Sequence, residues 1–275
     1  MKGRLLAACI GLKLAGLIMV FGADMALLGW TIFLSGGGLV VLHMLIPSWQ
    51  GLCDVATAFE PENKAVWLTI DDGPDPQDTP RLLDLLAEHN ARATFFLIGE
   101  RAARHPELVQ AIRDAGHEIG CHTNTHPRFT FWTFGRRHTA AEVDRALDAI
   151  EQTRGDAVFF RPPVGIKNLW LRRILRERNL RCVAWSIRSG DGVGKDPQAI
   201  IDHVQRQARP GDIVLMHEGP AVAPQVRLAA ITGVLEALSR EGFAFILPTA
   251  DQLRTTPVSF STAPPPTSTK ELLCN

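Results

Sequence analysis

Two adjacent carboxylates, Asp71 and Asp72, follow the apolar run 65–70. This run, Ala-Val-Trp-Leu-Thr-Ile, has the composition of a parallel strand that is buried on both faces. Two like charges at the end of a buried strand repel each other and are costly to bury without a partner. The pair therefore predicts a positive partner at this point, either a bound cation or a basic side chain.

Two histidines four residues apart, His122 and His126, follow another apolar run. Two imidazoles and one carboxylate from a neighbouring strand end form a common ligand set for a divalent metal ion. We expect Asp72 to bind such an ion together with the two histidines, and Asp71 to act as a general base toward water. Zinc suits these ligands best, and cobalt, nickel or iron suit them as well.

Two further polar residues follow other predicted strands. Arg161 is placed to hold Asp71 ionised, and His217 is placed to protonate a leaving amine. Each residue taken alone could have an ordinary non-catalytic role, such as a surface ion pair for Arg161. Polar groups at five strand ends favour one shared site, because active sites of parallel α/β folds lie where the strands end.

The elements that must position these residues alternate between short apolar runs and helical patterns. Strands are predicted at 66–70, 93–98, 117–121, 158–161, 181–187, 212–216 and 243–246. Helices are predicted at 79–90, 100–115, 139–154, 168–178, 196–207 and 225–240. The alternation predicts an α/β fold, and about seven repeats favour a distorted (β/α) barrel of parallel strands.

The N-terminal 48 residues have the composition of a membrane anchor. Residues 5–47 contain only three charged or histidine side chains, Lys13, Asp24 and His43. The runs 5–22 and 25–47 each reach the roughly 20 residues that a membrane-spanning helix needs. We therefore predict a hairpin of two transmembrane helices over 1–48. A single anchor or a cleaved signal peptide is the alternative, since Lys13 weakens the first span.

Charged flanks predict the orientation of this anchor. Lys2 and Arg4 place the N-terminus on the cytoplasmic side of a bacterial inner membrane, and two crossings return the chain to that side. The catalytic domain at 65–254 would then lie on the cytoplasmic face, after a linker at 49–64. A tail rich in proline and threonine, 255–275, is expected to be disordered.

Four segments of the chain form a recognisable series: Thr-Ile-Asp-Asp-Gly-Pro at 69–74, His-Thr-Asn-Thr-His at 122–126, Arg-Pro-Pro at 161–163 and Leu-Met-His at 215–217. In this order and spacing, they resemble the motifs of the polysaccharide deacetylase family, also called the NodB-homology domain or carbohydrate esterase family 4. The resemblance covers about residues 64–250. It implies a distorted barrel and the metal-dependent removal of N- or O-acyl groups from sugars.

The resemblance also implies a role for individual residues. It makes Asp71 the base and His217 the acid, and it places Leu215 in the substrate-binding part of the site. The metal ligands that it implies are Asp72, His122 and His126.

The sequence departs from the family pattern at the substrate pocket. Val164 replaces the usual aromatic residue, although its backbone N–H can still bind an oxyanion. In the motif Asp-x-x-Asp-Trp, Arg188 and Gly192 replace the first acid and the tryptophan. Asp191 remains as the second acid, which the resemblance implies would orient His217 and raise its pKa. These changes predict a wider and more basic pocket, in which Arg188 can meet a phosphate group.

Together these observations predict a membrane-anchored, metal-dependent deacylase of an amino-sugar polysaccharide or glycoconjugate. One alternative is a deacetylase or deformylase of a lipid-linked sugar at the membrane surface. Another is a catalytically inactive, glycan-binding relative, which the altered motifs favour and the intact base, acid and metal ligands disfavour. The partner is a carbohydrate or glycolipid. Nucleic acid is not expected, because 29 basic and 29 acidic side chains balance. No pattern predicts an oligomeric state.

An aromatic group follows the second motif, at Phe129, Phe131, Trp132 and Phe134. Core or loop packing is the ordinary interpretation of these four side chains. The alternative is a lip that contacts sugar rings or the bilayer surface.

Overall fold

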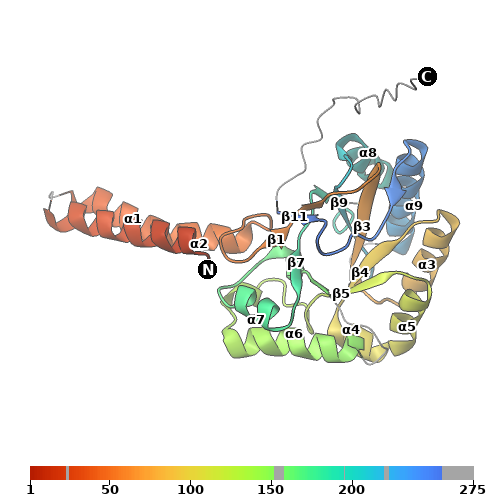
Figure 1. The fold of residues 1–275 in the computed structure, drawn as a ribbon, viewed down its shortest axis with the longest axis horizontal. Helices are drawn as coiled ribbons and strands as arrows, with labels where there is room; N and C mark the ends of the chain where they lie inside the picture. The colour runs from red at the N-terminus through yellow and green to blue at the C-terminus, as the bar shows by residue number, and fades with distance from the viewer. Residues whose placement is uncertain (23–24, 152–157, 195, 220–222, 256–275) are drawn as a thin grey trace, which may run out of the picture.

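A helical hairpin projects from an α/β domain in the computed structural model of the chain (Figure 1). The structure describes residues 1–275 except 23–24, 152–157, 195, 220–222 and 256–275. The predicted tail at 255–275 therefore lies, apart from Thr255, outside the described residues.

A curled parallel sheet forms the centre of the domain. Its strands follow the order β1-β7-β6-β5-β4-β3-β9-β8, and β10 pairs with the start of β3. Their bounds are β1 Val55–Ala56, β3 Ala65–Gly73, β4 Ala93–Leu97, β5 Glu118–Cys121, β6 Phe159–Phe160, β7 Arg181–Val183, β8 Ile187–Arg188, β9 Ile213–His217 and β10 Ala244–Phe245. The path begins at β1 and ends at β8, so the sheet is an open half-barrel. The predicted α/β fold with parallel, barrel-like strands is confirmed.

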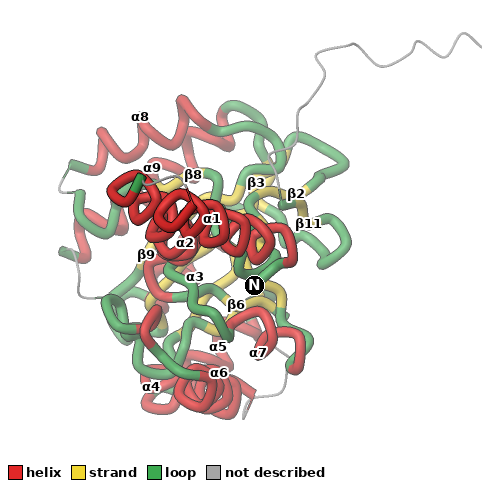
Figure 2. Tube along the Cα trace, turned by 90° about the vertical axis from the view of Figure 1, so that its left-hand side faces the viewer, coloured by secondary structure: helices red, strands yellow, loops and turns green. Residues whose placement is uncertain are grey.

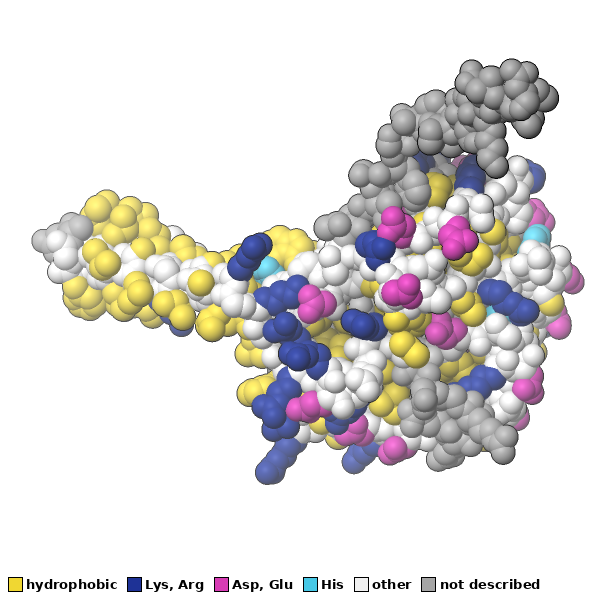
Figure 3. Space-filling model, in the orientation of Figure 1, with side chains coloured by type: hydrophobic (Ala, Val, Ile, Leu, Met, Phe, Trp, Pro, Cys, Tyr) yellow, Lys and Arg dark blue, Asp and Glu magenta, His cyan; other side chains and the backbone are white. Residues whose placement is uncertain are grey.

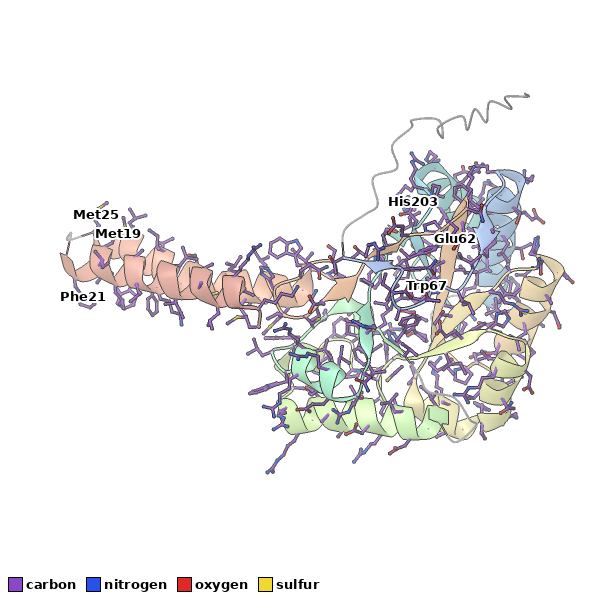
Figure 4. The ribbon with its side chains drawn as sticks, viewed as in Figure 1. Met19, Phe21, Met25, Glu62, Trp67 and His203 are labelled. Atoms are coloured by element: carbon purple, nitrogen blue, oxygen red, sulfur yellow. The ribbon has the colours of Figure 1, made fainter. Side chains whose placement is uncertain are left out.

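Helices cover the outside of the sheet (Figure 1). They are α3 Thr79–Glu88, α4 Gly99–Arg104, α5 Pro106–Asp114, α6 Arg136–Glu151, α7 Leu171–Glu177, α8 Pro197–Gln207 and α9 Pro224–Arg240. The helix predicted at 100–115 is divided into α4 and α5, because Pro106 has no N–H to continue the ladder of α4. Between sheet and helices lies a continuous apolar core, which includes Ile70, Phe95 and Val109. Figure 4 places Trp67 of β3 inside the domain, where its Nε1–H donates to Thr94 Oγ1 at 2.8 Å.

The segment predicted as one strand at 181–187 forms two strands that lie far apart along the sheet order. β7 pairs with β1 and β6, whereas β8 pairs with β9. Between them, Ala184 N–H donates to Ala56 O at 2.8 Å and Ser186 N–H donates to Ile213 O at 3.1 Å. The chain therefore crosses the open side of the half-barrel here, and an apolar run alone cannot show such a change of partner.

The stretch 49–64, for which the sequence predicts a linker, contains two short strands. β1 joins the large sheet beside β7, and β2 (Ala58–Phe59) pairs antiparallel with β11 (Leu253–Arg254). Phe59 is fully buried. This stretch therefore attaches the hairpin to the sheet through hydrogen bonds and core packing.

The hairpin consists of α1 (Gly3–Gly22) and α2 (Ala26–Leu45), which pack side by side as an antiparallel pair (Figures 1 and 2). Glycines allow this close approach, because a Cβ on Gly16 would lie 2.6 Å from Gly29 O. Both helices are long and apolar enough to cross a membrane, and most of their surface is exposed. Figure 3 shows apolar side chains over the hairpin, and Figure 4 places Met19, Phe21 and Met25 at its far end.

Candidate active site

A bulge in β3 explains how two adjacent carboxylates can belong to one site. Consecutive side chains of a regular strand point to opposite faces of the sheet. The pairing of β3 with β4 shifts between Asp71 and Gly73, and Asp72 has a φ of 73°. The bulge therefore re-aims Asp72 so that its carboxylate lies on the same side as that of Asp71. On the other side of β3, Asp71 is in register with His217 of β9.

Three side chains converge as a candidate metal site, namely Asp72, His122 and His126. Asp72 Oδ1 lies 3.2 Å from His126 Nε2 and 3.5 Å from His122 Nε2. His122 Nδ1–H donates to Arg161 O at 2.7 Å, which leaves the Nε2 lone pair directed toward Asp72. Asp72 Oδ1 is buried and has no hydrogen-bond partner among the described residues. The unpartnered carboxylate oxygen between two imidazoles fits a bound divalent cation.

The electrostatics of this site agree with metal binding. Burial, together with the neighbouring His122 and Arg128 side chains, lowers the pKa of His126 to about 3. His126 is therefore neutral near pH 7, as a metal ligand must be. Burial raises the pKa of Asp72, but contact with the two histidines outweighs it and holds the pKa below its usual range. Asp72 is therefore a carboxylate.

Arg161 is the basic partner of the second carboxylate, Asp71. The Arg161 guanidinium is fully buried and donates from Nη1 to Asp71 Oδ1 at 2.6 Å. It also donates to Thr69 Oγ1 at 2.9 Å and to Ala184 O at 2.7 Å. These bonds fix the guanidinium, and the ion pair holds the Asp71 carboxylate in place. The free oxygen, Asp71 Oδ2, lies 3.7 Å from His122 Nε2, beside the candidate metal site.

His217 and Asp191 form the other side of the site. Asp191 is fully buried, accepts from His217 Nδ1–H at 2.7 Å and accepts from the His217 backbone N–H at 2.7 Å. Ser189 Oγ–H also donates to Asp191, at 2.7 Å. Burial lowers the pKa of His217, but Asp191 and then Asp71 outweigh this effect and raise it to about 9. His217 is therefore protonated near pH 7.

A cavity of about 180 Å³ connects these groups. Its lining includes both aspartates, both candidate ligand histidines and His217, together with Arg128, Phe129, Val164, Trp185, Arg188, Val193 and Leu215. The structure thus brings together every residue for which the sequence predicts contact with metal, water or substrate. Arg161 and Asp191 lie behind the cavity and bond to Asp71 and His217.

The model of the family described as polysaccharide deacetylase matches residues 59–183. A peptidoglycan-N-acetylglucosamine deacetylase of Bacillus cereus is 36% identical over 188 residues, which cover 66% of this chain and 85% of that protein. The chain belongs to the polysaccharide deacetylase family. It is therefore a hydrolase that acts on carbon–nitrogen bonds other than peptide bonds.

Two further similarities place this polysaccharide deacetylase among its relatives. A chitooligosaccharide deacetylase of Sinorhizobium fredii is 36% identical over 190 residues, covering 65% of this chain and 87% of the relative. The structure of a family 4 carbohydrate esterase from Streptomyces lividans in complex with acetate superposes with a TM-score of 0.63. It is 34% identical, and the match covers 70% of this chain and 96% of that one.

Within this polysaccharide deacetylase, the residues that depart from the family motifs lie at the rim of the cavity. Val164 sits in a 3-10 turn, Pro163–Gly165, with a φ of 48°, which is unusual for a β-branched residue. Arg188 is in register with Leu215 of β9, so both border the same part of the cavity. Gly192 opens a space beside the His217 ring, because a Cβ there would lie 3.6 Å from the ring.

Glu142, which the sequence did not predict as a site residue, positions the loop that carries His126. From α6, its carboxylate accepts from Asn124 N–H at 3.0 Å and from Thr125 N–H at 2.9 Å. It also accepts from the Thr125 hydroxyl at 3.0 Å. The loop needs this support because His126 itself has a φ of 53°. A glutamate on the helix face that also carries buried apolar residues is the one sequence signal that points to Glu142.

Arg128 was also missed, although it lies at the centre of the site. Its Nη2 is 3.4 Å from Asp72 Oδ2, and its side chain is about half exposed. Nothing in the sequence distinguishes it from a surface arginine. The aromatic group near it has two roles, since Phe131 is buried in the core whereas Phe129 is 82% exposed and lines the cavity.

Proposed function

We propose that this polysaccharide deacetylase is a metal-dependent deacylase that hydrolyses an N-acetyl or similar acyl group on an amino sugar. The observation that carries the proposal is the placement of a held carboxylate and a protonated imidazole across one cavity. Asp71 is fixed by Arg161, and His217 is fixed by Asp191. Between them lie the three candidate metal ligands.

Each residue then has a defined task in amide hydrolysis. Asp72, His122 and His126 would hold a divalent cation, which would supply Lewis acidity to the carbonyl and to water. Asp71 takes a proton from the attacking water as the new carbon–oxygen bond forms. His217 gives its proton to the nitrogen as the carbon–nitrogen bond breaks, so that a carboxylic acid and a free amine leave.

Arg161 and Asp191 act in this scheme through other residues. Arg161 holds the Asp71 carboxylate in place, and Asp191 keeps His217 protonated and aimed into the cavity. Val164 N–H is the proposed donor to the oxyanion, while Leu215 and Arg188 form walls that contact substrate.

The hairpin is proposed to anchor the enzyme in the inner membrane of a bacterium. Two adjacent helices of 20 residues, each apolar and mostly exposed, support this location. Lys2 and Arg4 precede or begin the first helix and favour a cytoplasmic N-terminus. The domain would then face the cytoplasm, and zinc is the metal we expect, with cobalt, nickel or iron as substitutes.

The full chain, purified in detergent, tests the proposal. We expect about one divalent ion per chain by elemental analysis and acetate release from N-acetylglucosamine oligomers. Asp71→Asn should keep the ion and lose activity at least about a hundredfold, because a general base contributes that much. His122→Ala should lose the ion. The matched control is His89→Ala, a histidine that follows α3 outside the cavity lining and whose loss should change neither quantity.

The outcomes separate the proposal from its rival. The Arg188 and Gly192 replacements favour an inactive, glycan-binding relative, which would bind sugar oligomers and release no acyl group under any metal. A chain that holds no ion would contradict the metal-dependent mechanism itself.

A further inference from the structure

The base of the hairpin rests against the wall of the active site. Lys167 is fully buried; its backbone N–H donates to Met44 O at 2.9 Å, and its Nζ donates to Ile46 O at 2.5 Å and to Pro47 O at 2.8 Å. Next to it, a Cβ on Gly165 would lie 2.5 Å from Pro47 Cγ. The turn that carries the cavity residue Val164 is therefore packed directly against the end of α2.

This contact sets the depth of the cavity relative to a membrane. Each helix has 20 residues and so spans about 30 Å, the thickness of a hydrocarbon core. When the hairpin crosses a bilayer, Met44 and Pro47 lie where the hydrocarbon gives way to headgroups. The turn at 163–165 then lies at headgroup level as well.

Several exposed apolar side chains of the domain lie in this same region. Beyond the hairpin, the described residues include six large exposed hydrophobic side chains, at Phe129, Trp132, Val164, Leu169, Trp170 and Val193. Phe129, Val164 and Val193 line the cavity. Leu169 and Trp170 follow Lys167 along the chain after Asn168. Phe129 could stack on a sugar ring, but Val164 and Val193 have no flat face for stacking and are better suited to hydrocarbon.

Basic side chains accompany the apolar ones. Arg128 and Arg188 both line the cavity, and Arg188 is exposed and has no acidic partner among the described residues. Arg172, Arg173 and Arg176 of α7 border a hollow together with Met1, at the base of the hairpin. Figure 3 shows Lys and Arg side chains gathered on the part of the domain next to the hairpin. Such a surface attracts anionic headgroups and phosphate.

We propose that the substrate is an amphiphile, a glycosyl phosphate or diphosphate carried on a long hydrocarbon chain in the same bilayer as the hairpin. The inference rests on the proposed deacylase function and specifies its substrate class. The acylated sugar occupies the cavity, and the phosphate lies between Arg128 and Arg188. The hydrocarbon chain runs over Phe129, Val164 and Val193 into the membrane.

Four probes separate the parts of this substrate. They are N-acetylglucosamine 1-phosphate, the same sugar phosphate esterified to a long isoprenoid chain, a long-chain N-acetylglucosamine glycoside without phosphate, and a water-soluble N-acetylglucosamine tetramer. The full-length enzyme, loaded with metal in lipid nanodiscs, is assayed for acetate release. Binding of each probe to the Asp71→Asn enzyme is measured in parallel. We expect kcat/KM for the lipid phosphate to exceed that for each other probe at least about tenfold.

Substitutions at the rim identify which group binds which part. Arg188→Ala should lower kcat/KM for the lipid phosphate about tenfold more than for the phosphate-free glycoside, as expected for one charge-assisted contact. Phe129→Ser with Val193→Ser should remove most of the preference for the long chain. The matched control is Arg240→Ala, an exposed arginine at the end of α9, which should change neither preference.

The pattern of turnover and binding over the four probes distinguishes failure of the proposed substrate class from failure of the proposed deacylase function. Equal or better turnover and binding of the soluble tetramer would overturn the amphiphile and leave the deacylase intact. Equal use of the free sugar phosphate would overturn the hydrocarbon contact. Binding of the lipid phosphate without acetate release from any probe would support the substrate class and contradict the proposed N-acetyl hydrolysis.

Discussion

Single residues in this site work in pairs, and the pair of His217 and Asp191 predicts a pH dependence. His217 must be protonated to act as the acid, so activity should fall as the pH rises through its raised pKa of about 9. Asp191→Asn removes the buried negative charge that favours the imidazolium. We expect the alkaline limb of the kcat/KM profile to move about one to three pH units downward. Measurement of acetate release between pH 5 and about 10.5 checks this.

A milder substitution beside Asp191 serves as the control for this experiment. Ser189→Ala removes one hydrogen bond to Asp191 but no charge, so its alkaline limb should move less than that of Asp191→Asn. An alkaline limb that stays in place in Asp191→Asn would show that His217 is not the titrating acid.

Among the elements, α6 has a role in metal affinity through Glu142. Glu142→Ala frees the two N–H groups and the hydroxyl that now hold the loop before His126. Removing a residue that supports a metal ligand typically weakens metal affinity about 10–100-fold. We therefore expect the metal Kd of Glu142→Ala to rise by that factor. Activity at saturating metal should largely return. Titration with a zinc indicator measures the Kd, and Asp148→Ala, an exposed acid on the same helix, should leave it unchanged.

The elements also show which features a sequence can predict. The strands that lead to Asp71, His122 and His217 could be predicted, because each apolar run and the polar residue after it are adjacent along the chain. The division of 181–188 into β7 and β8 could not, since it depends on which distant strands accept the hydrogen bonds. Two-residue strands such as β1 could not be predicted for the same reason, because they are defined by the strand with which they pair. The bulge that aims Asp72 is likewise a property of pairing with β4, so two adjacent carboxylates predicted a shared site but not its geometry.

At the scale of the whole molecule, Lys167 connects the base of the hairpin to the wall of the active site. Lys167→Met keeps the length of the side chain but removes the Nζ donor to Ile46 O and Pro47 O, so that Ile46 O keeps only the Trp49 N–H at 3.2 Å. The base of the hairpin should then loosen from the turn at 163–165, while the catalytic groups keep their own hydrogen bonds. We expect kcat/KM for the long-chain sugar phosphate to fall about tenfold, the effect of losing roughly one buried charged hydrogen bond.

The soluble N-acetylglucosamine tetramer provides the comparison, because it does not approach the site from a bilayer. Its turnover by Lys167→Met should stay within about twofold of the parent enzyme, a difference well below that of one such hydrogen bond. Lys64→Met, an exposed lysine that bonds to Glu241 O, is the matched control and should affect neither substrate. An equal loss on both substrates would mean that Lys167 supports the fold of the site itself. No loss on either would mean that the hairpin holds the enzyme at the membrane without aligning its cavity.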